Sequence, residues 1–308
     1  MSAGTPVLRP RPIIPTCLSA MEYLGTVIRP PSEAESLLLQ VAYGCPHNAC
    51  AFCGAYRDKP YGIKSEAALA VDLDEVAADT RRPRRIFLCD GDALALPVDR
   101  LLRLLTAIRE KLPWIARVSS YASGASLARL SDDALTALRH AGLAKVYIGL
   151  ESGDAPTLAA MGKATDVSAI VTGGRRAKAA GLTVSATVLL GLAGVARSAI
   201  HARLTGEALT AMAPHEAAAL SLMCIPGTPL DAWVTAGRFV LPDAAGLLRE
   251  LHTLLAHTDF RGLFFANHAS NYLPLRLRLP RDKVAGLDRI DAALAGAVPL
   301  RPEAARRL

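Results

Sequence analysis

SLLLQVAYGCPHNACAFCGAY, residues 36–56, is the most informative stretch of this chain. Its first half is an apolar run that is typical of a buried β-strand. Its second half places three cysteines, Cys45, Cys50 and Cys53, within nine residues directly after that strand. Half of the six cysteines therefore crowd into one loop, which a disulfide framework would not do. Clustered thiols of this kind indicate a metal site or a redox site.

Outward from this loop, strand-like and helix-like patterns alternate along the chain. Six strands are predicted, at 37–44, 85–90, 116–122, 145–152, 183–191 and 217–224. Helices are predicted over 65–80, 97–112, 131–142, 166–181, 198–212 and 243–255. Six successive strand–helix units imply an α/β fold with a parallel sheet. The count favours a partial, open (β/α)6 TIM-like barrel over a complete eight-unit barrel. On count alone, a flat doubly wound sheet suits the pattern equally well.

Two further segments flank this core. Residues 1–35 are rich in proline and are expected to form an extended arm, and residues 36–260 the core barrel. Residues 261–308 are expected to form a C-terminal extension, a turn and then a helix over 280–296, that closes the open side of the barrel. The turn holds His268, Ser270, Asn271 and Tyr272, which either pack there or line a substrate pocket.

The length, composition and net charge limit the class of protein. The 308 residues are 51% hydrophobic and 20% charged, enough to bury a sizeable core. No apolar run reaches the length of a membrane span, and the first residues do not read as a secretory signal. We therefore expect a cytoplasmic protein that does not bind a membrane. The formal charge of +7 suits an anionic substrate or a nucleic acid, although no added RNA-binding domain is recognisable.

Two kinds of metal site fit the spacing C-x4-C-x2-C. A structural zinc needs four ligands, and His47 is the only local candidate for the fourth. This gives one hypothesis, a non-catalytic zinc-binding module with a Cys3His site. Alternatively, three thiolates without a fourth leave one iron of a 4Fe–4S cluster open to a substrate. The scattered cysteines Cys17, Cys89 and Cys224 are expected to be packing residues.

The cysteine loop resembles that of the radical SAM superfamily, and the resemblance spans residues 36–260. Members most often carry C-x3-C-x2-C after the first barrel strand, so this chain has one extra residue between Cys45 and Cys50. The resemblance implies the radical SAM type of partial barrel. It also implies that the three cysteines hold a 4Fe–4S cluster whose open iron is chelated by S-adenosyl-L-methionine. Phe52 matches the family's aromatic residue, which packs near the adenine.

Later segments resemble the family's other cofactor-binding motifs. In CDGDALALP (89–97), the resemblance assigns Asp90, Gly91 and Asp92 to the methionine amino group of the nucleotide. In GLESG (149–153), it assigns Glu151 and Ser152 to the ribose or the methionine end. Positions expected to meet the adenine or the carboxylate lie further along the chain: Gly191 in SATVLLGLAG (185–194), Arg197 just after it, and Pro226 and Gly227 in MCIPGTPL (223–230).

The resemblance also implies an activity. A one-electron donor such as flavodoxin or ferredoxin would reduce the cluster, and reductive cleavage of S-adenosylmethionine would give a 5′-deoxyadenosyl radical that takes hydrogen from an unidentified small molecule. Catalytic residues beyond the cluster ligands are not assigned. A tRNA-modifying radical SAM enzyme is a further alternative, which the basic charge favours and the missing RNA-binding domain disfavours.

Overall fold

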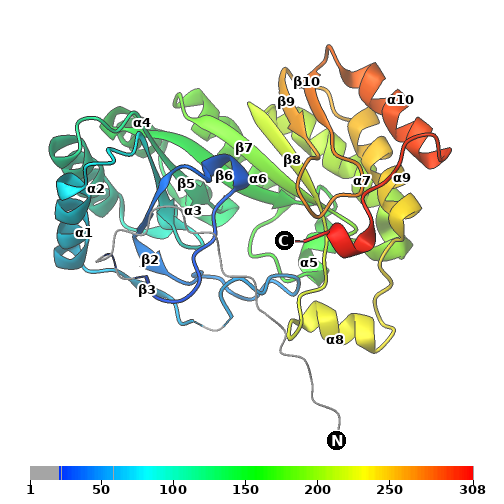
Figure 1. The fold of residues 1–308 in the computed structure, drawn as a ribbon, viewed down its shortest axis with the longest axis horizontal. Coiled ribbons are helices and arrows are strands. Elements are labelled where there is room, and N and C mark those ends of the chain that lie inside the picture. Colours follow the sequence, from blue (N-terminus) through cyan, green and yellow to red (C-terminus); the bar gives the residue numbers. More distant parts are fainter. Residues whose placement is uncertain (1–20, 22, 58, 308) are drawn as a thin grey trace, which may run out of the picture.

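The computed structural model describes residue 21, residues 23–57 and residues 59–307. Its centre is a curved, open sheet with the strand order β1-β4-β5-β6-β7-β8-β9-β10 (Figure 1). Neighbouring strands are parallel except β9 and β10, which are antiparallel. The bounds are β1 (Leu37–Gln40), β4 (Arg85–Cys89), β5 (Arg117–Ala122), β6 (Leu143–Glu151), β7 (Thr183–Leu190), β8 (Glu216–Ser221), β9 (Gly262–Phe265) and β10 (Arg276–Leu279).

Helices connect the successive parallel strands, as the alternating pattern predicts. The six expected helices are α1 (Glu66–Ala78), α2 (Val98–Lys111), α4 (Asp132–Ala141), α6 (Val167–Ala179), α7 (Gly194–Met212) and α9 (Ala244–Ala256). Serine or aspartate side chains cap the amino ends of α1, α4, α6 and α9. The structure adds three short helices that the sequence pattern did not predict: α3 (Gly124–Arg129), α5 (Ala155–Ala160) and α8 (Pro229–Thr235). In the described part of the chain, no helix is both long and apolar enough to span a membrane.

The C-terminal segment extends the sheet. Strand β9 lies where a turn was expected and pairs with β8, and β10 then pairs with β9. Within the described residues the sheet thus has seven parallel strands and one antiparallel strand, rather than the six strands expected. The apolar run of β9 is only four residues long, too short to show a period. The last long helix, α10, covers Lys283–Leu294, and the domain division at residue 260 stays a prediction.

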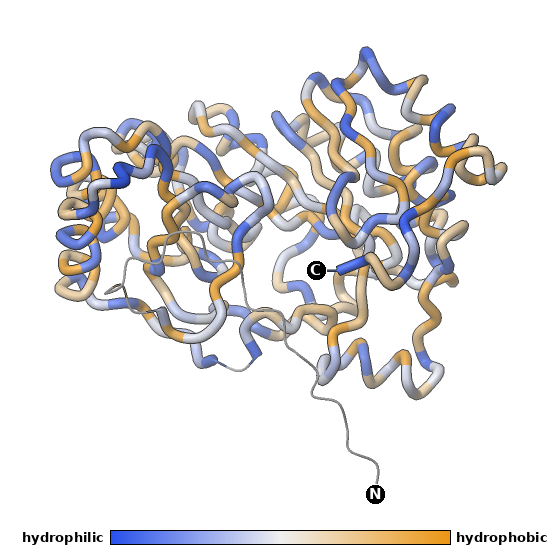
Figure 2. Tube along the Cα trace, viewed as in Figure 1, coloured by the Kyte–Doolittle hydropathy of each residue, from blue (hydrophilic) through white to orange (hydrophobic). Residues whose placement is uncertain are grey.

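The two faces of the sheet pack differently. Along β4, Ile86 and Leu88 join the main hydrophobic core beneath the helices, whereas Phe87 and Cys89 join a separate inner cluster. This alternation follows from the two-residue period of a strand. The long helices lie on the outer side of the sheet (Figure 1), and apolar and polar residues alternate along α1 and α2 (Figure 2). The long helices therefore leave the inner face of the sheet open to contacts with other segments of the chain.

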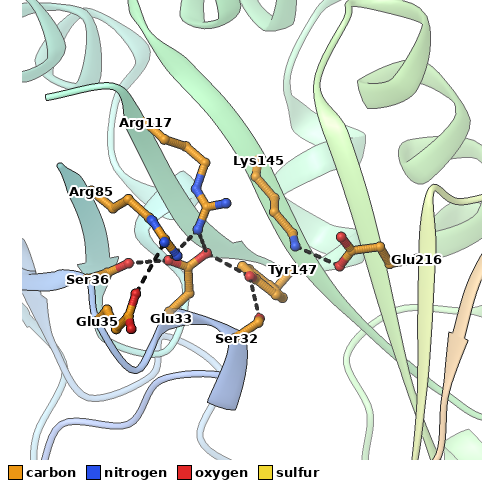
Figure 3. Close-up of polar contacts among 9 residues, drawn as sticks. All are labelled: Ser32, Glu33, Glu35, Ser36, Arg85, Arg117, Lys145, Tyr147 and Glu216. Carbon is orange, nitrogen blue, oxygen red and sulfur yellow. Dashed lines mark hydrogen bonds and ion pairs between the residues drawn. The ribbon is translucent and has the colours of Figure 1, made fainter. Parts of the chain in front are cut away.

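The end of the expected arm crosses the inner face of the sheet. The hydroxyl of Tyr23 donates to the carbonyl of Leu38, 2.7 Å away. At its other end, the buried carboxylate of Glu33 accepts hydrogen bonds from Arg117 at 2.8 Å and from Tyr147 at 2.7 Å (Figure 3). These contacts fasten the arm to β1, β5 and β6. Residues 1–20, including Cys17, lie outside the described residues.

The Glu33 contacts predict a pH dependence of stability. Burial by itself would raise the pKa of Glu33, but hydrogen bonds from Ser36 and Tyr147 and the charge of Arg117 hold it below its ordinary value of 4.5. A carboxyl with a lowered pKa stabilises the fold above its unfolded pKa and loses this effect as the pH falls through the folded pKa. Glu33→Gln should cost about 1.5–3 kcal/mol of unfolding free energy at pH 7. Urea unfolding from pH 7 to pH 3 should show this difference shrinking below about pH 4.5; a constant difference would contradict it.

Candidate functional site

The cysteine loop is closed at its base by a small hairpin. Strands β2 (Ala42–Tyr43) and β3 (Gly62–Ile63) pair antiparallel, so the described residues between them, 44–57 and 59–61, belong to one loop at the carboxyl end of β1. Arg57 lies across this loop and donates to the carbonyls of Cys53 and Cys50, each at 2.8 Å. The amide of Cys53 also bonds to the carbonyl of Cys50 at 3.2 Å. The loop therefore has a defined shape around its three free thiols.

Asp90 connects this loop to the sheet. Its Oδ2 atom accepts hydrogen bonds from the amide of Gly44 at 3.0 Å, from Gln40 at 3.0 Å and from Lys59 at 2.7 Å. Asp90 is fully buried and the Lys59 side chain is only 5% exposed. Asp90 Oδ1 is buried too, and no described residue forms a hydrogen bond with it. Asp90 thus fixes the loop through Oδ2, while Oδ1 has no hydrogen-bond donor among the described residues.

Gly91 lies directly against the first cysteine. Its amide donates to the carbonyl of Gly44 at 3.0 Å. A Cβ atom at Gly91 would lie 2.7 Å from the Cβ of Cys45, closer than real contacts allow. Glycine is therefore required here by the close approach of two loops. The structure thus places Asp90 and Gly91 against the cysteine loop, and their assignment to the methionine amino group stays a prediction.

The segment after α5 holds the other side of the loop. The amide of Ala51 donates to the carbonyl of Met161 at 2.8 Å, and His47 Nε2 bonds to the carbonyl of Gly162 at 2.6 Å. A carbonyl only accepts, so His47 Nε2 carries the hydrogen. The next residue, Lys163, forms an ion pair with Glu151 at 3.0 Å. Glu151 ends β6 with a φ of 62°, at a point where the pairing with β7 shifts.

The charges of Glu151 and Lys163 act on the pKa values of the loop thiols. Burial raises the pKa of Cys50 to about 11, with the charge of Lys163 opposing the rise. Burial raises the pKa of Cys53 as well, and the charge of Glu151 adds to the rise. Burial alone would lower the pKa of Lys163, but Glu151 and Cys50 raise it. Lys163 was not among the residues that the sequence predicted for the site.

The remaining predicted positions lie at the same edge of the sheet but make other contacts. Asp92 is buried and accepts a hydrogen bond from Ser126 in α3 at 3.1 Å. Arg197 makes two hydrogen bonds to Asp154, at 2.9 and 2.8 Å. Phe52 packs in a hydrophobic cluster with Met161, Leu192, Leu222 and Leu230. The turn with Pro226 and Gly227 precedes α8 and is exposed, and Ile225 before it packs on Gly54 of the cysteine loop.

Ser152 and Gly191 belong to a buried polar network. Ser152 Oγ lies 2.7 Å from His201 Nδ1, and His201 Nε2 lies 3.1 Å from the carbonyl of Leu189. Because a carbonyl only accepts, His201 Nε2 carries the hydrogen and Nδ1 accepts from Ser152. Glu250 of α9 lies 3.2 Å from His201 Nε2 and accepts from the amide of Gly191. The network joins the carboxyl ends of β6 and β7 to α7 and α9.

This network predicts a stability effect at a distance from the cysteines. His201→Phe would remove the acceptor of the Ser152 hydroxyl and one contact of Glu250 in a fully buried position, while Glu250 keeps the amide of Gly191. We expect a loss of about 1–3 kcal/mol of unfolding free energy. Urea unfolding measures this, with His252→Phe as the matched control because His252 lies on α9 with its side chain 34% exposed. An equal effect of the two substitutions would show that the network contributes nothing.

The C-terminal turn lies beside the end of β8. Asn271 is buried and accepts from Ser221 Oγ at 2.8 Å, and Ser270 Oγ accepts from the amide of Ser221 at 3.1 Å. His268 lies 2.9 Å from Ser270 Oγ, and burial lowers the pKa of His268. Arg301 donates to three carbonyls of this turn. The turn is thus a packed polar structure, and a role in substrate binding stays a prediction.

Among the described residues, no group of three or more His, Cys, Asp or Glu side chains is arranged to hold a single metal ion. The ligands of a 4Fe–4S cluster bind different irons, so they stand further apart than the ligands of one ion.

Comparisons with known proteins extend these observations. Residues 39–202 match the family model described as the radical SAM superfamily. No curated protein matches the sequence. Coproporphyrinogen III oxidase from Escherichia coli, a radical SAM enzyme, has a similar fold with a TM-score of 0.55 and 16% identity, over 82% of this chain and 57% of that one.

Two further solved structures are similar. Methylornithine synthase gives a TM-score of 0.52 and 14% identity, over 73% of this chain and 64% of that one. A radical S-adenosylmethionine methyltransferase from Kitasatospora setae, solved with cobalamin and a [4Fe–4S] cluster, gives 0.54 and 16%, over 66% of this chain and 37% of that one. The chain thus spans less than two thirds of the length of each structure. At these identities the likeness shows the fold, and because the family model covers more than half of the sequence, the chain belongs to the radical SAM superfamily of enzymes.

Proposed function

We propose that this chain cleaves S-adenosylmethionine reductively at a 4Fe–4S cluster held by Cys45, Cys50 and Cys53, and that the radical formed takes hydrogen from a small-molecule substrate. One observation carries the proposal. In a chain of this superfamily, a loop with three free thiols is clamped between Asp90 on one side and the Glu151–Lys163 segment on the other. A flavodoxin or ferredoxin is the proposed electron donor. Location in the cytoplasm stays a prediction.

The residues of the loop fit an iron–sulfur cluster. Thiolates are the ligands that such clusters prefer, and three of them leave one corner for S-adenosylmethionine. When bound, the cluster supplies the electron that splits S-adenosylmethionine into methionine and a 5′-deoxyadenosyl radical. Loading requires deprotonated ligands, and burial raises the pKa values of Cys50 and Cys53, so both thiols release protons as the cluster binds.

The surrounding side chains fit the charged groups of S-adenosylmethionine. The buried Oδ1 of Asp90, without a partner among the described residues, suits the ammonium group of the methionine end. Lys163 supplies a cation for its carboxylate. Lys163 fits this role better than Arg197 because it directly follows Gly162, whose carbonyl bonds to His47 of the cysteine loop, whereas Arg197 is bound to Asp154. We propose Glu151 for the ribose hydroxyls and Phe52 for the adenine.

The test is an anaerobic reconstitution of the full chain with iron and sulfide. We expect a brown protein with iron and acid-labile sulfide in equal amounts. After reduction by dithionite it should convert S-adenosylmethionine to 5′-deoxyadenosine, and the unreduced sample is the control. Protein that binds iron and sulfide normally but forms no 5′-deoxyadenosine would refute the catalytic proposal. Protein that holds zinc and no sulfide would favour the non-catalytic zinc module instead.

A further inference from the structure

Two tyrosines of the sheet strands, Tyr121 and Tyr147, lie on the inner face, and among the described residues only Tyr147 has a partner for its hydroxyl. Tyr121 of β5 meets Phe87 edge-on at 4.9 Å between ring centroids and Tyr147 of β6 at 6.3 Å. The Tyr147 hydroxyl donates to Glu33 at 2.7 Å and lies 2.8 Å from Ser32 Oγ (Figure 3). Among the described residues, none forms a hydrogen bond with the hydroxyl of Tyr121. Tyr121 therefore keeps an O–H group that is free for a ligand.

The surroundings of Tyr121 connect it to the proposed cofactor site. Burial raises the pKa of Tyr121, and the charges of Cys89, Glu151 and Glu33 add to the rise. Burial raises the pKa of Tyr56 in the cysteine loop, and Tyr121 adds to the rise. The charge of Glu151 also acts on the pKa values of Cys50 and Cys53. Tyr121 pairs with Tyr147 of β6 and packs beside Cys89 on the inner face, and its side chain stays protonated at physiological pH.

We propose that Tyr121 donates a hydrogen atom to carbon radicals formed at this site. The inference rests on the proposed function, which supplies the radical. A phenolic O–H bond is weaker than an alkyl C–H bond, so transfer of hydrogen from oxygen to an alkyl radical is downhill. The O–H bond of Tyr121 breaks, a C–H bond forms, and a tyrosyl radical remains. One electron from the flavodoxin-type donor and one proton from water restore the phenol.

The conformation of the ring supports this role. Phe87 and Tyr147 hold the Tyr121 ring from two sides, and Phe87 is fully buried. Such packing limits the motion of the ring, and the side chain is half-buried. Cys89 is a further hydrogen donor in this inner cluster, and it is fully buried. Tyr121 is therefore less buried than the thiol.

The experiment uses the reconstituted full chain without a substrate. Reduced protein is incubated with S-adenosylmethionine in D₂O, and the 5′-deoxyadenosine is examined by mass spectrometry. Hydrogen from an exchangeable O–D group adds one deuterium, whereas hydrogen from a C–H bond adds none. We expect singly deuterated product from the wild-type protein and from Tyr147→Phe, the matched control. Tyr121→Phe should lower the deuterium content to the level found in H₂O.

Freeze-quenched electron paramagnetic resonance gives a second measurement, in which a tyrosyl signal should appear in the wild type and vanish in Tyr121→Phe. Loss of deuterium in Cys89→Ala with retention in Tyr121→Phe would assign the transfer to the thiol and overturn the proposal. Undeuterated product from the wild type would overturn it too, while leaving the proposed function intact. Absence of any 5′-deoxyadenosine would instead refute the proposed function itself.

Discussion

Replacing Cys45, Cys50 or Cys53 by alanine is expected to reduce 5′-deoxyadenosine formation to the background of protein without reductant. Each thiolate would bind a different iron of the cluster, so loss of one ligand removes a corner of the site. The three thiols come from one loop, and no other described cysteine lies in it. No further cysteine among the described residues of the loop can therefore replace the missing ligand. The measurements are iron and sulfide content and 5′-deoxyadenosine after reduction.

Cys224→Ala is the matched control for this prediction. Cys224 is a half-buried free thiol like the loop cysteines, but it follows β8 and packs near Phe52. The variant should retain iron, sulfide and cleavage of S-adenosylmethionine close to the wild-type level. Circular dichroism of all four variants checks that they fold. If a loop variant kept full activity with a normal cluster, the assignment of that cysteine as a ligand would be wrong.

Asp90→Ala is expected to give the largest loss of stability among single substitutions at the site. The change leaves Lys59, whose side chain is 5% exposed, as an unpaired cation and removes the acceptor of the Gly44 amide. Breaking a buried ion pair by removing one partner typically costs about 3–5 kcal/mol. Because Gly44 immediately precedes Cys45, the loop should also hold its cluster less well. Urea unfolding and iron content after reconstitution measure the two effects.

A double-mutant cycle separates the charge pair from general damage. Lys59→Met removes the buried cation, so Asp90→Ala should cost much less in that background than in the wild type. Asp90→Asn keeps the shape and one acceptor but loses the charge, and its effect should lie between those of the wild type and Asp90→Ala. Additive losses in the cycle would show that Asp90 and Lys59 do not interact as the structure indicates.

Most of the fold was predictable from the sequence, because its elements are long enough to show their period. The amphipathic run of α2 and the serine cap of α4 mark helices without any tertiary information. Several short elements, such as the β2–β3 hairpin and α8, were missed because two to seven residues show little of a strand or helix period. Strand β9 was missed for the same reason, which is why the sheet is wider than expected.

Residues of the site were predictable only where a recognisable sequence motif also lies beside the cysteine loop in the fold. Gly91 was singled out from sequence, and the structure shows why no side chain fits beside Cys45. Arg197 was expected to meet a carboxylate of the cofactor, and in the structure it meets Asp154. Lys163 had no assigned role, since nothing in its local sequence shows that the turn after α5 packs on the cysteine loop.

The sequence by itself determined the order of strands and helices, the class of the sheet and the three thiols at the end of the first strand. These follow from local periods and from residue types that are adjacent in the chain. Only the tertiary structure decided which polar groups already have a hydrogen-bond partner. It also decided which of them have none among the described residues, such as Asp90 Oδ1 and the hydroxyl of Tyr121. The reason is physical: a partner is set by distance in space, and residues such as Lys59 and Asp90 meet only after the chain has folded.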